Sequence, residues 1–292
     1  MRTFDVCVVG PITRDVIRIA GEPVRCMPGG AVHYAGVALG SLGARTAVVT
    51  KAAADDAEAL LAPLRGAAVT TSCRTSLRTT RFENSYGPER DAREQRVTSL
   101  ADPLTAQDLC QVRARYVHLG PLTRGDMGPP FFEAIARRGQ RVYLDVQGLL
   151  RAVVDGEIVP CGWPQRARVL GSIYGLKADL GEARLLCGRE APEAAARALA
   201  DEGVREVIVT LGREGSLILA DGEMHRIPAL APRRIADVTG CGDTYLAGYI
   251  YRRLQSDDVA TAGRFAAALA TLKMERYGPF DGSEGEVLAR LQ

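Results

Sequence analysis

Residues 237–243 of the chain read Asp-Val-Thr-Gly-Cys-Gly-Asp, immediately before a stretch with helical periodicity. Gly240 and Gly242 let the backbone approach a ligand closely, and a helix from about Cys241 to Leu254 would direct unpaired N–H groups toward negative charge. Asp243 falls in the first turn, where the helix dipole favours an ionised carboxylate. Such a carboxylate can accept the proton of a hydroxyl that attacks phosphorus. These parts suit phosphoryl transfer, although a glycine turn with an acidic cap has the same pattern.

Two common phosphate-binding motifs are missing from the sequence. No lysine follows a glycine, which excludes a Walker A loop. No Gly-x-Gly-x-x-Gly follows the first apolar strand, which argues against a dinucleotide-binding Rossmann unit. The glycine turn at 240–242 is therefore the predicted phosphate site.

A second group of candidate residues lies near the amino terminus. Gly10-Pro11-Ile12-Thr13-Arg14-Asp15 follows the first predicted strand, and ligands of α/β sheets bind at strand ends. Asp15 can accept hydrogen bonds from a polyol, or it can cap a turn. The pair Gly29 and Gly30 opens a predicted helix and would let the backbone approach a bound hydroxyl.

The elements that must position these residues alternate along the chain. Short β-branched runs predict strands at Asp5–Val9, Arg45–Thr50, Arg115–Leu119, Arg141–Val146, Ser172–Leu176 and Glu206–Leu211. Helical periodicity predicts helices at Val32–Leu42, Asp55–Leu64, Met127–Arg138 and Pro192–Glu202. This alternation indicates an α/β fold with a mostly parallel sheet that is covered on both faces.

Two segments interrupt this alternation and predict a small antiparallel flap. Residues 14–28 and 78–99 are strand-like, and the second segment places Thr80, Phe82, Asn84 and Tyr86 on one face before Gly87-Pro88. Such a flap can act as a lid that excludes water, or it can be a surface hairpin. The sequence has no repeat and no linker, so we expect residues 1–292 to form a single domain with this minor lid.

Composition excludes several classes of protein. A net charge of +2 with scattered arginines predicts no nucleic-acid or membrane partner, and the scarcity of lysine (Lys51, Lys177 and Lys273) is interpreted as codon bias. Seven cysteines without Cys-x-x-Cys, together with three histidines, favour a reducing cytoplasm over disulfides or structural zinc. We expect no signal peptide and no membrane span, because no apolar run reaches about 20 residues.

The candidate motifs occur in a characteristic order along the chain. The strand-end Asp and the Gly-Gly pair precede a Lys-x-Asp-x-x-Glu at 177–182, a Val-Thr-Leu-Gly-x-x-Gly at 209–215 and the Asp-x-Thr-Gly-Cys-Gly-Asp stretch. In this order the chain resembles the ribokinase-like (PfkB-type) carbohydrate kinase family over nearly its whole length, most specifically in Ile235–Gly248. The resemblance implies a three-layer α/β sandwich with a small antiparallel β lid, and ATP-dependent phosphorylation of a hydroxyl.

The resemblance also implies roles for individual residues. Asp243 would be the catalytic base, and the amides of Gly240, Cys241 and Gly242 would form the anion hole. Asp15, Gly29 and Gly30 would hold the acceptor. The thiol of Cys241 is expected to be uninvolved, because no histidine is near it in the sequence.

For the donor and its cations, the resemblance implies a second set of residues. Thr210, Gly212 and Gly215 would border ATP, together with Gly240 and Gly242. Glu182 would organise Mg²⁺ and its waters, while Asp237 and Thr239 match positions where many members bind a potassium-like ion.

This chain departs from the family at informative positions. Tyr34 stands where sugar kinases commonly carry an acceptor-binding asparagine, which makes ribose a doubtful substrate. Asp179 replaces an asparagine and would strengthen Mg²⁺ dependence if it points inward. Residues 80–84, 145–148 and 273–280 resemble the inositol-kinase and unassigned sugar-kinase branch. Asn84 and Gln147 are therefore candidate acceptor-pocket residues, with lid packing and a capped strand end as the alternatives.

Three functions remain open on the sequence. The first is an ATP-dependent kinase of a sugar or cyclitol, and the second is a nucleoside kinase in which Tyr34, Phe82 and Tyr86 would stack on a base. The third is a ligand-sensing protein without activity, which the intact base and glycines argue against. A homodimer through the lid is a further expectation.

Overall fold

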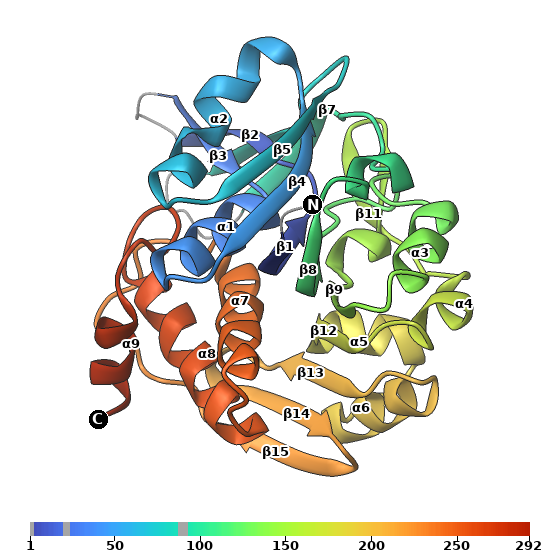
Figure 1. The fold of residues 1–292 in the computed structure, drawn as a ribbon, viewed down its shortest axis with the longest axis vertical. Helices are drawn as coiled ribbons and strands as arrows, with labels where there is room; N and C mark the ends of the chain where they lie inside the picture. The colour runs from blue at the N-terminus through green and yellow to red at the C-terminus, as the bar shows by residue number, and fades with distance from the viewer. Residues whose placement is uncertain (1–2, 20–23, 87–92) are drawn as a thin grey trace.

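The computed structural model describes residues 3–19, 24–86 and 93–292, in which strands between residues 3 and 227 assemble into two sheets (Figure 1). In sheet order, the nine strands of the large sheet there are β15 (Glu223–Ile227), β14 (Ser216–Ala220), β13 (Glu206–Thr210), β12 (Gly175–Asp179), β9 (Arg141–Asp145), β8 (Arg113–Leu119), β1 (Thr3–Val9), β4 (Thr46–Ala52) and β5 (Thr70–Thr75). Neighbours from β13 to β5 are parallel, whereas β14 and β15 form an antiparallel edge.

Helices cover both faces of the large sheet. They are α1 (Ala31–Ser41), α2 (Ala54–Gly66), α3 (Pro129–Ala136), α4 (Arg166–Leu170), α5 (Leu180–Cys187), α6 (Pro192–Asp201), α7 (Cys241–Leu254), α8 (Val259–Met274) and α9 (Glu284–Leu291). Short 3₁₀ turns occupy Ala106–Leu109, Gln147–Leu150 and Gly212–Glu214. Within the residues described, no helix is long and apolar enough to cross a membrane.

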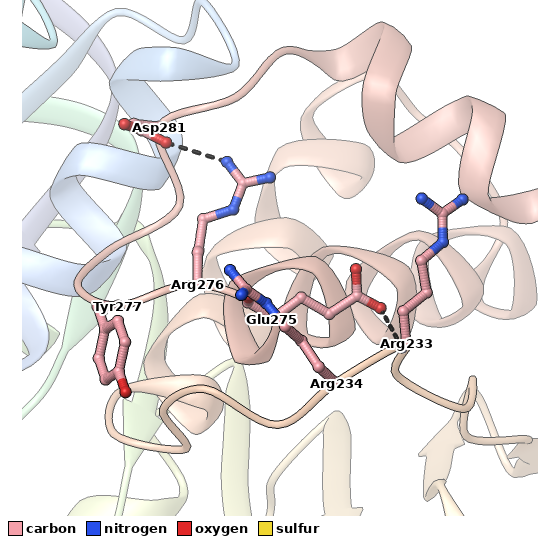
Figure 2. Close-up of a pocket in the computed structure, with 6 residues that line it drawn as sticks. All are labelled: Arg233, Arg234, Glu275, Arg276, Tyr277 and Asp281. Atoms are coloured by element: carbon pink, nitrogen blue, oxygen red, sulfur yellow. Dashed lines mark hydrogen bonds and ion pairs between the residues drawn. The ribbon is translucent and has the colours of Figure 1, made fainter.

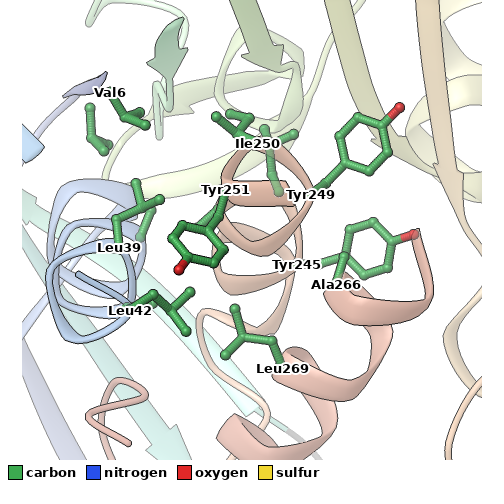
Figure 3. Packing of buried hydrophobic residues seen from close by; sticks show 14 of the residues in the cluster. Val6, Leu39, Leu42, Tyr245, Tyr249, Ile250, Tyr251, Ala266 and Leu269 are labelled. Carbon is green, nitrogen blue, oxygen red and sulfur yellow. The ribbon is translucent and has the colours of Figure 1, made fainter. Parts of the chain in front are cut away.

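Successive side chains of a strand point to opposite faces of the large sheet, so the hydrophobic core has one part on each face. On β1, Val6 and Val8 belong to the cluster that α1, α2, α7, α8 and α9 cover, whereas Cys7 and Val9 belong to the cluster under α3, α4, α5 and α6. Figure 3 shows α7 between α1 and α8, with Tyr251 near Leu39. The predicted three-layer α/β fold is therefore confirmed.

The smaller sheet contains the two segments predicted to form the lid. Its six strands in the described residues are, in order, β10 (Arg151–Val154), β11 (Glu157–Pro160), β7 (Arg93–Ser99), β6 (Arg81–Tyr86), β2 (Thr13–Ile19) and β3 (Arg25–Gly29). The sheet is antiparallel except for β2 and β6, which pair in parallel. The sequence predicted neither this parallel pair nor the contribution of β10 and β11. Gly87-Pro88 and the side chain of Tyr86 lie outside the described part.

Most predicted elements lie within a few residues of the observed ones, and α7 has the predicted bounds. The strand expected at Ser172–Leu176 was placed wrongly, since it runs from Gly175 to Asp179. Ser172 instead lies in the turn after α4, where its hydroxyl donates to the carbonyl of Val169 at 2.7 Å. The polar residues Lys177 and Asp179 concealed the second half of this otherwise apolar strand.

A buried carboxylate fixes α7 against the large sheet. Glu206 on β13 accepts hydrogen bonds from Tyr143 on β9 at 2.6 Å and from Tyr249 on α7 at 2.8 Å. Its other oxygen accepts from Arg253 at 2.6 Å and from Tyr174 at 3.4 Å. Because all these donors converge on one carboxylate, its loss would leave a partly buried guanidinium without its partner.

We predict that Glu206→Ala lowers the free energy of unfolding by about 3–5 kcal/mol, as expected for breaking a buried ion pair. The matched control is Glu193→Ala, which removes an ion pair to Arg226, whose side chain is 71% exposed. This control should cost less than about 1 kcal/mol. Urea denaturation measures both values, and similar losses in the two variants would contradict this role for Glu206.

Candidate active site

A cavity of about 320 Å³ lies between the smaller sheet, the carboxyl ends of the central strands and the N-terminus of α7. Asp145, Asp179 and Thr210 are the last residues of β9, β12 and β13, so the parallel register brings them to one edge. The lining residues are Thr13, Asp15, Gly30, Tyr34, Phe82, Gln95, Leu122, Asp145, Gln147, Arg151, Lys177, Asp179, Thr210, Val238, Thr239, Gly240, Cys241, Gly242 and Asp243.

Most of the predicted site residues line this cavity. Those that do so are Asp15, Gly30, Tyr34, Gln147, Asp179, Thr210, Thr239, Gly240, Cys241, Gly242 and Asp243. Those that lie behind or beside it are Gly29, Asn84, Glu182, Gly212, Gly215 and Asp237. The structure thus brings residues from both ends of the chain to one place.

The turn at 240–242 requires glycine for steric reasons. Gly240 is the N-cap of α7 with a φ of 74°, and a Cβ there would lie 2.1 Å from a ring carbon of Tyr34. A Cβ on Gly242 would lie 2.7 Å from Nζ of Lys177. The amide of Cys241 donates to the carbonyl of Val238 at 3.3 Å. The first N–H groups of a helix have no partner within the helix and can face an anion.

Asp243 stands beside these amides with a perturbed pKa. Burial, and then the nearby carboxylate of Asp145, raise the pKa of Asp243 to about 7, although Lys177 and Arg151 oppose the shift. The sequence argument considered only the helix dipole and predicted an ionised carboxylate. In the structure the carboxyl instead titrates near neutral pH, which is the range suited to a general base.

Lys177 and Asp145 form a buried ion pair beside the glycine turn, with 2.8 Å between Nζ and Oδ2. Burial alone would lower the pKa of Lys177, but Asp145 and Glu182 outweigh it and the pKa is raised. The sequence analysis gave neither Lys177 nor Asp145 a role. One signal was present, because a lysine inside an apolar strand needs a buried acidic partner.

Asp179 and Glu182 form a capping box at the start of α5. Asp179 Oδ1 accepts from the amide of Glu182 at 2.7 Å, while Glu182 Oε2 accepts from the amide of Asp179 at 2.8 Å. Burial raises the pKa of Glu182, and Lys177 opposes that shift. Each carboxylate therefore uses one oxygen locally and has a second oxygen for other partners.

The acidic side chains around the cavity suit a Mg²⁺ ion that is bound mainly by phosphate oxygens and water molecules. The charge of Asp145 raises the pKa values of both Glu182 and Asp243, so these groups lie close together. Among the described residues, however, no group of three or more His, Cys, Asp or Glu side chains has the arrangement of a metal site. Mg²⁺ commonly binds to few carboxylates and retains several waters, which agrees with this sparse set.

The acceptor side combines residues of β2 and the lid. Asp15 lies within β2 rather than in a turn after β1, and its Oδ1 accepts from the hydroxyl of Thr13 at 2.7 Å. A Cβ on Gly29 would lie 2.4 Å from Asp15 Oδ2, so Gly29 makes room for that carboxylate. Asn84 is buried and accepts from Gln95 at 2.8 Å. Gln95, which the sequence analysis did not consider, lines the cavity in its place.

Beside the donor side, a tight turn follows β13. A Cβ on Gly215, whose φ is 94°, would lie 2.0 Å from the carbonyl oxygen of Ile227, so the turn packs against the end of β15. Gly212 begins the intervening 3₁₀ turn. Thr210 lines the cavity, whereas these two glycines shape the backbone next to it.

The potassium site predicted at Asp237 and Thr239 does not fit the side chains present. Nζ of Lys273 donates to the carbonyl and to Oδ2 of Asp237, each at 2.8 Å. Oδ1 of Asp237 accepts from the amide of Thr239 at 2.9 Å. An ammonium group already occupies the place where these oxygens would bind a cation.

The thiol of Cys241 is unsuited to nucleophilic chemistry. Burial raises the pKa of Cys241 to about 11, so the thiol stays protonated near neutral pH. Its Sγ lies 3.9 Å from the carbonyl oxygen of Ala270. The contribution expected from this residue is its backbone amide.

A second cavity, of about 560 Å³, contains none of the predicted site residues. Figure 2 shows its lining of Arg233, Arg234, Glu275, Arg276, Tyr277 and Asp281. One pair of its charges is joined within the lining, since Arg276 contacts Asp281 at 3.0 Å, and Glu275 accepts a hydrogen bond from the backbone amide of Arg233 at 2.6 Å. The first cavity is therefore the better candidate for chemistry.

Comparison with known proteins agrees with this geometry. Residues 140–284, which include the Lys177 strand and the glycine turn, match the profile of the pfkB family carbohydrate kinases. The chain belongs to this family. A nucleoside kinase of Methanothermobacter thermautotrophicus is 41% identical over 80 residues, which are 27% of this chain and 25% of that kinase. The chain therefore matches only about a quarter of the length of this curated relative.

Solved structures match the pfkB chain over nearly its whole length. A pyrophosphate-dependent kinase in the ribokinase family, complexed with a pyrophosphate analog and myo-inositol, is 26% identical with a TM-score of 0.85 and covers 97% of this chain and 99% of its own. The ribokinase of Arabidopsis thaliana, complexed with ribose and ATP, is 20% identical with a TM-score of 0.80, covers 100% and 99% of the two chains, and shows the shared fold.

We predict that the carboxyl group of Asp243 titrates with a pKa of about 7. Carbon-13 NMR of labelled aspartate, assigned by difference from Asp243→Asn, measures it. Asp145→Asn should lower this pKa, because it removes a neighbouring negative charge. A wild-type value near the ordinary value of about 4 would contradict the arrangement of charges described above.

Proposed function

We propose that this protein transfers a phosphoryl group to a hydroxyl of a sugar or cyclitol, with Asp243 as general base. The observation that carries the proposal is the position of Asp243, next to the glycine turn and in the same cavity as Asp15. A base, an anion site and a polyol-binding carboxylate then face one enclosed space. In-line phosphoryl transfer needs this kind of positioning and charge stabilisation.

In the proposed mechanism, Asp243 accepts the proton of the attacking hydroxyl. The amides of Gly240, Cys241 and Gly242 stabilise the charge on the transferring phosphoryl group. Lys177 adds a positive charge next to Gly242, and its pair with Asp145 holds that charge in place. Mg²⁺, organised by Glu182 with Asp179 beside it, would neutralise charge on the donor phosphates.

A cyclitol is the acceptor class that this cavity supports best. Asp15, Gln95, Gln147 and Arg151 line it and offer polar groups to several hydroxyls at once. Tyr34 fills the position where an asparagine was expected for ribose. The 26% identical kinase that was solved with myo-inositol also supports this acceptor class.

We infer that ATP is the donor, with pyrophosphate as a second candidate. The resemblance of residues 209–215 to the ATP-bordering turn favours ATP. Pyrophosphate is favoured by the full-length likeness to a pyrophosphate-dependent kinase. Both donors would place their transferable phosphoryl group at the same amides.

A nucleoside is a second candidate acceptor, because Tyr34 and Phe82 both line the cavity and offer aromatic surface to a base. The segment shared with a nucleoside kinase also favours it. A ligand-sensing role without activity has no comparable support, since Asp243 and both glycines are intact. Dimerisation through the lid stays a prediction that sedimentation of the full chain would test.

The function is tested by measuring phosphorylated product for ATP and for pyrophosphate, with Mg²⁺, across inositols, sugars and nucleosides. We predict turnover with an inositol or a sugar, and a loss of about 10²–10⁴-fold in Asp243→Asn, the range attributed to a general base. Turnover confined to nucleosides would select the second acceptor class. Equal turnover in the two proteins would exclude Asp243 as the base.

Gly242→Val is predicted to lower kcat far more than it weakens acceptor binding, because its side chain would displace Lys177 from the phosphoryl site. Gly162→Val is the matched control, since no atom lies within 4 Å of a Cβ at Gly162 and its φ lies outside the left-handed region. Acceptor affinity can be measured by calorimetry without donor. A defect in acceptor affinity alone would contradict this placement of the phosphoryl group.

A further inference from the structure

Lys273 is a buried cation beside the glycine turn, and the chemistry proposed above assigns it no role. It lies near the end of α8, its side chain is 0% exposed, and its Nζ donates to two oxygens of Asp237 at 2.8 Å each. The same Nζ lies 5.3 Å from the centre of the Tyr34 ring. A fully buried ammonium is costly unless its partners are well placed, so this contact is a specific feature of the fold.

The residue that binds this ammonium also shapes the anion site. The amides of Ala236 and Asp237 donate to the carbonyl of Met274, which ties the loop to the end of α8. Oδ1 of Asp237 then accepts from the amide of Thr239, one residue before Gly240. Lys273 therefore holds the loop that leads into α7.

The contacts of Lys273 resemble those of a monovalent cation. Such ions are bound in loops by backbone carbonyl and carboxylate oxygens, and here the ammonium takes one oxygen of each kind from Asp237. The ring of Tyr34 lies within the distance of a cation–π contact, close to the remaining side of the ammonium. A potassium ion at this place would collide with Nζ and would meet its positive charge.

We propose that the ammonium of Lys273 serves as a built-in monovalent cation, which makes the anion site independent of potassium. This inference rests on the proposed phosphotransferase function and adds the cation requirement of the same site. Lys273 is a positioning residue, because it does not line the 320 Å³ cavity and acts through Asp237 and Tyr34. Tyr34 links the ammonium of Lys273 to both parts of the site. Its ring packs against Gly240 of the anion site, and the residue also lines the acceptor cavity.

The first test uses the full-length wild-type protein, freed of potassium and ammonium, in choline chloride. Replacing choline by potassium at constant ionic strength should leave kcat and KM unchanged within about twofold, a change too small to indicate a bound activator. Activation of about tenfold or more by potassium would overturn the proposal.

The second test uses Lys273→Met, which keeps the length of the side chain and removes its charge. In choline buffer its kcat should fall by about 100-fold, as expected when a reacting group is misplaced by roughly 1 Å. Potassium or ammonium ions should restore a large part of that loss, whereas lithium should not. A folded Lys273→Met protein whose kcat no monovalent cation raises would overturn the proposal.

Lys51→Met is the matched control for this variant. Lys51 is also largely buried and pairs with Asp108 at 3.2 Å, but it does not line the cavity. Its removal can cost stability, yet the kcat of Lys51→Met should not respond to potassium. A similar potassium response in Lys51→Met would show that the ion stabilises the protein in general and would contradict the assignment to Lys273.

A binding measurement separates this proposal from the proposed function. Potassium should raise the melting temperature of Lys273→Met by about 2 °C or more above that in sodium or choline, and it should not do so for the wild type. This result supports the built-in cation even if no acceptor is turned over. A potassium-selective rise in the wild type would overturn it, and if Lys273→Met does not fold, the wild-type measurements decide.

Discussion

Three carboxylates and a buried ammonium share the space at the N-terminus of α7, and the rest of the site depends on their balance. Asp145, Glu182 and Asp243 lie close enough to Lys177 to raise its pKa, and burial disfavours the ionised forms of Glu182 and Asp243. With one ammonium among them, Asp243 is left with a pKa near neutral pH. The carboxylates outnumber the ammonium, and a donor phosphate would add further negative charge, which Mg²⁺ would neutralise.

Two of the chain's three lysines lie next to the glycine turn or the loop that precedes it. Lys177 reaches the turn from β12 at Gly242, and Lys273 reaches it from α8 through Asp237. The turn is thus contacted from β12 and held from α8, while Glu206 ties α7 itself to β13. Stability and catalysis are therefore coupled through one helix, whose inner side packs in the core and whose N-terminus faces the cavity.

The sequence predicted the parallel sheet and the position of α7, because both rest on local periodicity. The resemblance to the kinase family also predicted that Asp15, Gly30 and Asp243 share one site, and all three line one cavity. It could not predict the charge balance, because the partners of Lys177 and Lys273 come from 32 and 36 residues away. The scarcity of lysine was interpreted as codon bias, although two of those lysines turned out to be buried beside the site. Similarly, Asn84 had a plausible spacing, but its pairing with Gln95 depends on the register between β6 and β7.

The most direct measurement is the distance from Asp243 to the acceptor in a crystal structure with myo-inositol and a non-transferable donor analogue. We predict an acceptor hydroxyl within about 3 Å of a carboxylate oxygen of Asp243, which is the reach of a general base. The donor's terminal phosphoryl group should then face the amides of Gly240, Cys241 and Gly242. A closed complex in which every acceptor hydroxyl lies beyond about 5 Å from Asp243, with no bridging water, would contradict the central role given to this residue.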